Sequence, residues 1–352
     1  METRAVLARL DAVVQAGESA ALATVVRVIG SAYRHAGAKL LVLSDGSTVG
    51  NVSGGCLEQD VVQVARHVLR SGAPELRIYC SSHDTVHAWD LGLGCEGRVD
   101  VRVAAARGSP PLVRELLASS APVPFVLCTD LEGRALTVTA EACQGGLGSP
   151  DLDDQALARA RDLLAQECGS LESIRGRSIF FDAFDPPPTL VICGAGEDAP
   201  ALARLASGVG FRVVVVDRRS GRLDPARFAD AERLIETDGE NLARLIVPAR
   251  SYAVVMTHNF ADDMAYVAAL VSTPIPYIGV LGPRERTSHM LETAGLGITA
   301  AIDPRRLHGP VGLDIGADGA EQVALSIVAE LLAFRSDRPA QSLRDRALGI
   351  HA

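Results

Sequence analysis

The chain has 352 residues, of which 48% are hydrophobic and 22% are charged, and its formal net charge is −9. This length is enough for about two globular domains. The lack of any clustered lysines and arginines argues against a nucleic-acid partner, because a phosphate backbone requires a cationic face. No apolar run reaches the roughly 18–20 residues of a membrane span. Seven cysteines in no small-domain framework indicate reduced thiols, so we expect a cytoplasmic protein with no membrane partner.

The first half of the chain, residues 1–184, is predicted to be an α+β domain. Its N-terminal segment mixes charges with apolar residues at helical spacing, which is typical of an amphipathic helix and not of a signal peptide. The stretch 143–154 is rich in glycine and is expected to be irregular. Short apolar runs predict strands at 21–30, 38–44, 47–52, 76–81, 98–103, 124–129, 135–140 and 178–184, and helical spacing predicts helices from 56 to about 70 and from about 154 to 167.

The sequence "DPPPT" at 185–189 is predicted to be a linker, because consecutive prolines end helices and strands. Beyond it, continuous apolar strands alternate with helical segments, a pattern typical of a parallel sheet covered on both faces. We therefore expect an α/β protein in which a C-terminal Rossmann-like parallel-sheet domain, residues 189–334, follows the α+β domain. The polar tail at 335–352 is expected to be loosely held.

The sequence "LVICGAGEDAP" indicates a dinucleotide-binding turn between a strand and a helix. Gly194 permits the tight turn, Gly196 allows a pyrophosphate to approach the backbone, and Ala199 allows close packing. Asp217 ends the next strand, 23 residues after Gly194, where a carboxylate can accept hydrogen bonds from a ribose. This spacing predicts binding of NAD(P), with NAD preferred over NADP. A Rossmann domain kept only as a scaffold is the alternative.

Two further residues follow strands of the predicted parallel sheet. His258 comes after "YAVVMT", at the carboxyl edge where such folds bind ligands. It is a candidate acid/base residue or a structural histidine. Arg284 begins the helix after "YIGVLGP", where it either contacts an anion or is simply solvated.

The sequences "GNVSGGCLEQD" and "GLGCEG" each place a cysteine beside glycines. Cys56 is predicted to open a helix, whose dipole favours the thiolate, and the preceding glycines leave the sulfur accessible. Cys95 has similar access, but the negative charge of Glu96 opposes a thiolate. Accessible thiolates suit a soft metal, sulfur transfer or redox chemistry. His83 and His87 are expected to lie in a loop bordering this site. The other cysteines are interpreted as space-filling residues: Cys80, Cys128, Cys143, Cys168 and Cys193.

The chain resembles the XdhC/CoxI family of accessory proteins for molybdenum hydroxylases. The resemblance is carried by "GSAYRHAGAKLLVLSDGSTVGNVSGGCLEQDVV", "DLGLGCEGRVDVRV", "LVICGAGEDAPALARLASGVGFRVVVVDRR", "VVMTHNFADD", "YIGVLGPRER" and "GPVGLDIGADGAEQVALSIVAEL". The chain differs from the family's usual residues at Tyr33, Glu96 and Glu197.

The resemblance implies a non-catalytic chaperone that binds molybdenum cofactor, protects it during sulfuration and delivers it to a xanthine dehydrogenase-type apo-hydroxylase. A cysteine desulfurase is the implied second partner, and a homo-oligomer is expected. Cys56 and Cys95 would be the metal-binding thiols, and the other implied cofactor-binding residues are Ser53, Gly54, Gly55, Glu58 and Gly94.

Two alternatives of other functional classes stay open. An NAD(P)-dependent oxidoreductase would use His258 as acid/base and would not need either cysteine. A sulfur-transfer protein would carry a persulfide on Cys56.

Overall fold

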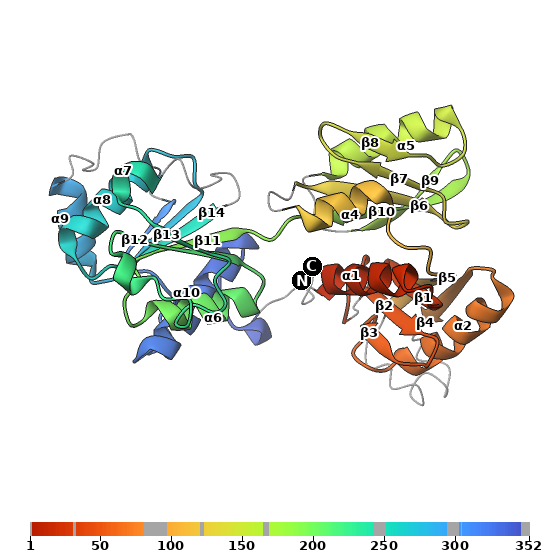
Figure 1. Cartoon of the computed structure of the whole chain (residues 1–352), viewed down its shortest axis with the longest axis horizontal. Coiled ribbons are helices and arrows are strands. Elements are labelled where there is room, and N and C mark those ends of the chain that lie inside the picture. The colour runs from red at the N-terminus through yellow and green to blue at the C-terminus, as the bar shows by residue number, and fades with distance from the viewer. Residues whose placement is uncertain are drawn as a thin grey trace. The chain divides into compact units, whose positions relative to one another are not determined.

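The computed structural model describes residues 2–30, 33–80, 97–119, 123–164, 169–242, 251–293, 303 and 305–345. The chain divides after Pro186 into two compact units (Figure 1). Within the described ranges, no helix combines the length and the apolar character needed to cross a membrane.

The first unit begins with a five-stranded antiparallel sheet, here called sheet A, in the order β3-β2-β1-β5-β4. Successive residues of β2 face opposite sides: Leu40 and Val42 pack against α2, whereas Leu41 and Leu43 pack against α1. The elements of this part are α1 (Glu2–Gln15), β1 (Ala20–Gly30), β2 (Lys39–Leu43), β3 (Thr48–Gly50), α2 (Glu58–Ser71), β4 (Glu75–Cys80) and β5 (Gly97–Ala105).

A second five-stranded antiparallel sheet, sheet B, completes the first unit in the order β8-β7-β6-β10-β9. Helix α5 covers one face of it, where apolar residues of β6, β7 and β10 share a core with the helix. The elements of this part are α4 (Pro111–Ala118), β6 (Phe125–Asp130), β7 (Ala135–Val138), β8 (Cys143–Gly145), α5 (Pro150–Leu163), β9 (Ser170–Ile174) and β10 (Arg177–Phe184).

The second unit contains a six-stranded parallel sheet, sheet C, in the order β13-β12-β11-β14-β15-β16. Its elements are β11 (Thr189–Cys193), α6 (Ala199–Gly208), β12 (Arg212–Asp217), the short 3-10 helix η1 (Ser220–Arg222), β13 (Arg233–Glu236), α7 (Gly239–Leu242), β14 (Ser251–Val255), α8 (Phe260–Val271), β15 (Tyr277–Val280), α9 (Arg284–Thr293), β16 (Leu307–His308) and α10 (Ala320–Arg335), and the 3-10 helix η3 (Leu343–Asp345) follows them.

Helices cover both faces of sheet C, which explains why its central strands are apolar without alternation. Helices α6 and α10 share a core with one face, and α7, α8 and α9 share a core with the other (Figure 1). The strand order reverses between β11 and β14, so the carboxyl ends of these two strands form the switch point where α/β sheets bind ligands.

The predicted fold class is confirmed: a Rossmann-like parallel sheet follows an antiparallel α+β unit. Three details differ from the expectation. Helix α2 begins at Glu58 and not at Cys56. The stretch 143–154, expected to be irregular, contains β8 and the first turn of α5. Helices α4 and α7 and the strands β9, β13 and β16 were not predicted, since short or edge elements carry little periodic signal.

Candidate functional site

The turn between β3 and α2, residues 51–57, is organised by the hydroxyl group of Ser53. This buried hydroxyl accepts hydrogen bonds from the backbone N–H groups of Gly55 at 3.2 Å and Leu57 at 3.0 Å. It donates its own hydrogen to Glu58 Oε2. The side chain of Ser53 therefore connects Gly55, Leu57 and Glu58, the first residue of α2.

The carboxylate of Glu58 completes this arrangement from the helix side. Its Oε1 accepts from the N–H groups of Val52 at 3.2 Å and Ser53 at 2.9 Å. Burial alone would raise the pKa of Glu58, but the hydrogen bonds from Ser53 and Val52 outweigh burial and hold the pKa below its ordinary value. Glu58 is thus an ionised residue that positions the turn, and both of its oxygens are engaged.

Of the two glycines in the turn, Gly55 borders open space and Gly54 lies against Tyr33. Gly55 has φ +111°, and no atom lies within 4 Å of where its Cβ would stand. A Cβ on Gly54 would stand 3.4 Å from the ring of Tyr33. Among the described residues, the N–H groups of Gly54 and Cys56 have no hydrogen-bond partner. The half-buried thiol of Cys56 lies two residues before α2 rather than in its first turn. The turn thus presents a thiol and two free donors together.

In the second unit, Gly194 lies at the switch point between β11 and β14. Its φ is +117°, and a Cβ there would approach Met256 O and Thr257 Cα to 2.7 Å. The N–H of Gly194 donates to Val216 O at 2.8 Å, which joins the turn to β12. Only glycine fits this position, because both the backbone conformation and the close approach exclude a side chain.

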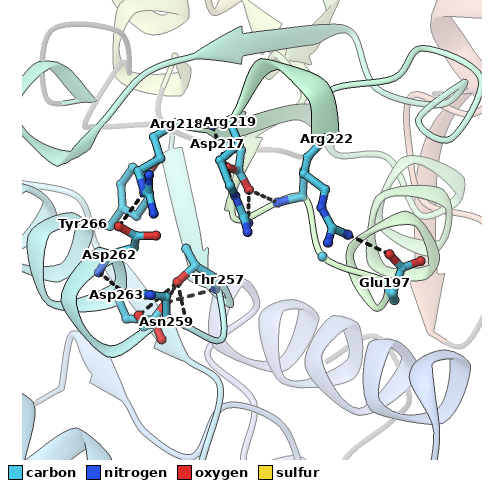
Figure 2. Close-up of polar contacts among 12 residues, drawn as sticks. Glu197, Asp217, Arg218, Arg219, Arg222, Thr257, Asn259, Asp262, Asp263 and Tyr266 are labelled. Atoms are coloured by element: carbon cyan, nitrogen blue, oxygen red, sulfur yellow. Dashed lines mark hydrogen bonds and ion pairs between the residues drawn. The ribbon is translucent and has the colours of Figure 1, made fainter.

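Asp217 lies at the carboxyl end of β12, as expected, but its carboxylate is already engaged within the protein. Oδ2 accepts from Ala195 N and from Arg219 Nη2, both at 2.8 Å, and Oδ1 accepts from the N and Nε of Arg219 at 2.9 Å (Figure 2). Burial opposes ionisation, yet these hydrogen bonds lower the pKa of Asp217 to about 2. A ribose at this position would have to compete with Arg219.

The remainder of the glycine-rich turn is held by arginines that follow β12. Glu197 pairs with Arg222 at 2.8 Å and with Arg227 at 3.2 Å. Figure 2 shows the first of these pairs at the outer edge of the site. Arg227 also donates to the carbonyl oxygens of Ala195 at 3.3 Å and Gly196 at 3.0 Å. These contacts fix the turn without a ligand, and the role of Arg227 was not predicted from the sequence.

His258 follows β14 at the same edge of sheet C and adopts φ +61°. Its Nε2 lies 3.3 Å from Asp198 Oδ2, and its ring lies 3.3 Å from where a Cβ of Gly196 would stand. The imidazole therefore borders the glycine-rich turn. Nearby, Arg218 pairs with Asp262 at 2.7 Å (Figure 2).

The predicted anion-binding residue Arg284 is exposed at the start of α9. The arginine that the structure brings to the switch point is Arg286, whose Nη2 lies 2.7 Å from the buried carboxylate of Asp263. Asp263 Oδ1 also accepts from the N and Oγ1 of Thr257, at 2.9 Å and 2.6 Å. Thr257 and Arg286 were not predicted as site residues, because no sequence motif connects either of them with Asp263.

Gly94, Cys95, His83 and His87 lie outside the described residues, so their predicted proximity to Cys56 stays a prediction. Cys168 also lies outside them. In the ranges that the structure covers, no three histidine, cysteine or acidic side chains gather in a way that would hold a metal ion. The cysteines interpreted as space-filling are of two kinds: Cys128 and Cys193 are buried, but Cys80 and Cys143 are exposed, so that interpretation is wrong for the latter two.

The chain thus combines a Rossmann-type unit with an antiparallel unit that carries a glycine–cysteine turn. Comparison with known proteins gives this architecture a family. Residues 13–79 match the model of the XdhC and CoxI family, and residues 190–331 match that of the XdhC Rossmann domain. The chain belongs to the XdhC/CoxI family.

Its relatives extend over almost the whole chain. A probable xanthine dehydrogenase subunit of Bacillus subtilis (strain 168) is 33% identical over 332 residues, which are 93% of this chain and 96% of the relative. The molybdenum cofactor insertion chaperone PaoD of Escherichia coli (strain K12) is 26% identical over 91% of this chain and 84% of its own. The crystal structure of a xanthine dehydrogenase from Bacillus halodurans superposes with a TM-score of 0.78 at 29% identity, covering 97% of this chain and 98% of that one.

Proposed function

We propose that the protein is a maturation factor that binds molybdenum cofactor, protects it while sulfur is installed, and delivers it to a xanthine dehydrogenase-type apo-hydroxylase. The names of two relatives support the maturation role: one is called a probable subunit of xanthine dehydrogenase and another a molybdenum cofactor insertion chaperone. In this proposal the cofactor is cargo, and the protein's own residues bind and release it without being changed. A cysteine desulfurase is the proposed source of sulfur.

The turn at residues 53–56 is the observation that carries the proposal. Molybdenum in this cofactor accepts soft sulfur ligands, and the half-buried Cys56 offers one. The cofactor also carries a phosphate group, for which the free N–H groups of Gly54 and Cys56 are suitable donors. Ser53 and Glu58 keep these donors in position before the cargo arrives, so binding does not require the turn to be reordered.

The proposal is tested by purifying the full-length protein from molybdenum-replete cells and measuring molybdenum by mass spectrometry and pterin by fluorescence. Cys56→Ser keeps the volume of the side chain but removes the soft ligand, so we expect it to retain less than about a tenth of the wild-type cofactor. Cys143→Ser is the matched control, since it alters an exposed thiol elsewhere in the same unit, and it should retain the cofactor. Cys95→Ser is expected to lose less than Cys56→Ser.

The two alternatives predict different results in the same preparation. An NAD(P)-dependent oxidoreductase would bind nicotinamide dinucleotide equally well in wild type and in Cys56→Ser. A persulfide carrier would accept labelled sulfur on Cys56 from a cysteine desulfurase in the absence of molybdenum. Equal molybdenum and pterin in wild type and Cys56→Ser would overturn the proposed role of the thiol.

A further inference from the structure

A partly open cavity of about 180 Å³ lies in the first unit, between sheet A and sheet B. Its walls come from α1, β1 and β5 on one side and from β6, β7 and β10 on the other. Among the described residues, none of the cysteine turn or of the second unit lines it, so it differs from both candidate sites described above. An apolar cavity of about 150 Å³ in another protein holds benzene. The cavity here is therefore large enough for a small organic molecule.

Most of the lining is apolar. Leu7, Leu10 and Phe180 are each less than a twentieth exposed, and Val113 of α4 is fully buried. Small side chains at Ala104 and its neighbours in β5 leave the space between these larger residues unfilled. An apolar body would recover contacts that the empty space lacks.

Two of the charged groups in the cavity neutralise each other. Lys39 Nζ on β2 lies 2.5 Å from Asp182 Oδ2 on β10, and both side chains are more than nine-tenths buried. Burial raises the pKa of Asp182, and the charge of Lys39 offsets part of that effect. This pair leaves no charge for a ligand to satisfy.

Arg102, in contrast, forms no ion pair with any residue that the structure describes. Its Nη2 donates to Leu131 O at 3.2 Å, while its buried Nε has no hydrogen-bond partner among the described residues. Asp130 acts on it through its charge but is itself held by Arg134 and Arg177 at 2.8 Å. Burial lowers the pKa of Arg102. Arg102 as a whole is half-buried, but its Nε is buried without a partner, and of the other charged residues in the lining Glu132 is paired with Arg134. A charged group with a buried, unpaired donor favours an anionic partner.

A second unsatisfied group lines the same cavity. Ser109 is 7% exposed, and its Oγ has no hydrogen-bond partner among the described residues, although its backbone N–H donates to Asp11 at 2.7 Å. A trapped water would satisfy this hydroxyl but would leave the guanidinium charge without a counter-charge. The charge of Arg102 therefore decides which class of ligand the cavity favours.

We propose that this cavity binds a small organic monocarboxylate, of about the size of benzoate, whose apolar body fills the space between the sheets and whose carboxylate pairs with Arg102. The apolar lining favours a ligand with an apolar body, and Arg102, whose Nε has no described partner, favours a single negative charge on that ligand. The volume of the cavity limits the size of the ligand. The proposal concerns a site distinct from that for molybdenum cofactor, and neither depends on the other.

Isothermal titration of the full-length protein with benzoate, substituted benzoates and branched aliphatic carboxylates tests the proposal. We expect at least one to bind, with its neutral amide weaker by about tenfold or more, because the amide lacks the charge that pairs with arginine. Arg102→Gln should weaken binding by a similar factor. Arg114→Gln, an exposed arginine on α4, is the control and should bind like wild type.

Ala104→Leu gives an independent test, because it fills the cavity and leaves Arg102 in place. It should abolish binding while the circular dichroism spectrum is unchanged. The proposal is overturned if none of the carboxylates binds the wild type, if amide and carboxylate bind equally, or if Arg102→Gln binds as tightly as Arg114→Gln.

Discussion

The hydroxyl of Ser53 has one donor and two acceptor positions, and the turn before α2 uses all of them. Because Glu58 receives that donated hydrogen while ionised, the geometry of the turn is linked to the charge of one carboxylate. The thiol of Cys56 is thus presented by a turn whose order depends on a residue that does not touch the cargo in our proposal.

We therefore expect Glu58→Gln to lower the free energy of unfolding of the first unit by about 1 kcal/mol at pH 7, a modest value because Glu58 is only partly buried. The pKa of Glu58 is lowered in the folded state, so its contribution is present above about pH 4.5 and is lost as the pH falls below that value. Urea unfolding at pH 7 and pH 3.5 measures the difference. Glu115→Gln, on an exposed position of α4, is the control and should show no pH-dependent difference.

A second carboxylate makes a larger contribution in the other unit. We expect Asp217→Asn to lower the free energy of unfolding by about 2 kcal/mol, since it weakens the hydrogen bonds from Ala195 and Arg219. Because the pKa of Asp217 falls from 3.8 to about 2 on folding, this stability is present above pH 3.8 and is lost between pH 3.8 and pH 2. Asp230→Asn is the exposed control. Equal denaturation midpoints for the two variants at pH 7 would contradict the assignment.

The sequence predicted the position of Asp217 but not the hydrogen bonds that its carboxylate accepts from Arg219. The spacing from Gly194 placed a carboxylate at the end of the second strand of the sheet, as the structure shows. The pairing of Arg219 with Asp217 depends on the conformations of both side chains. A sequence pattern does not predict side-chain conformation. Ser53 and Glu58 are five residues apart, which is not the spacing of a capping box, so their pairing had no recognisable pattern either.

Among the elements, the connection from β11 to α6 depends most on one residue type. We expect Gly194→Ala to lower the free energy of unfolding of the second unit by about 2–4 kcal/mol, because the new Cβ meets backbone atoms of Met256 and Thr257 at 2.7 Å. Gly208→Ala, at the end of α6, meets no atom within 4 Å. It should leave stability unchanged or raise it by up to about 1 kcal/mol. Denaturant titration of both variants distinguishes these effects, and similar losses in both would exclude a specific constraint at Gly194.

The elements most readily predicted were those with long apolar patterns. Helix α2 shows its stripe of Val61, Val64 and Val68, and β11 and β12 are continuous apolar runs, so their type followed from periodicity. The strands β8 and β16 have three and two residues. Such short strands form because a neighbouring strand supplies hydrogen bonds. The residues of the short strand alone therefore do not predict it. The start of α2 was placed too early for the same reason: the bonds made by Ser53 hold residues 54–57 in a turn.

At the scale of the whole molecule, each unit has its own hydrophobic cores. We expect calorimetry to resolve two unfolding transitions. Glu58→Gln should lower only the midpoint of the first unit's transition, and Asp217→Asn only that of the second, because the hydrogen-bond partners of each residue belong to its own unit. A single transition shifted by both variants would mean that the units unfold together.

The buried pair of Lys39 and Asp182 has a consequence for the order in which the protein is made. Its members are 143 residues apart in the chain, on β2 of sheet A and β10 of sheet B. At a synthesis rate of roughly 5–20 residues per second, the ribosome needs about 7–30 s to travel from one to the other. Throughout that interval the nascent sheet A holds a lysine whose carboxylate partner does not yet exist. The first unit can therefore reach its final packing only after β10 has emerged, late in the synthesis of its own half of the chain.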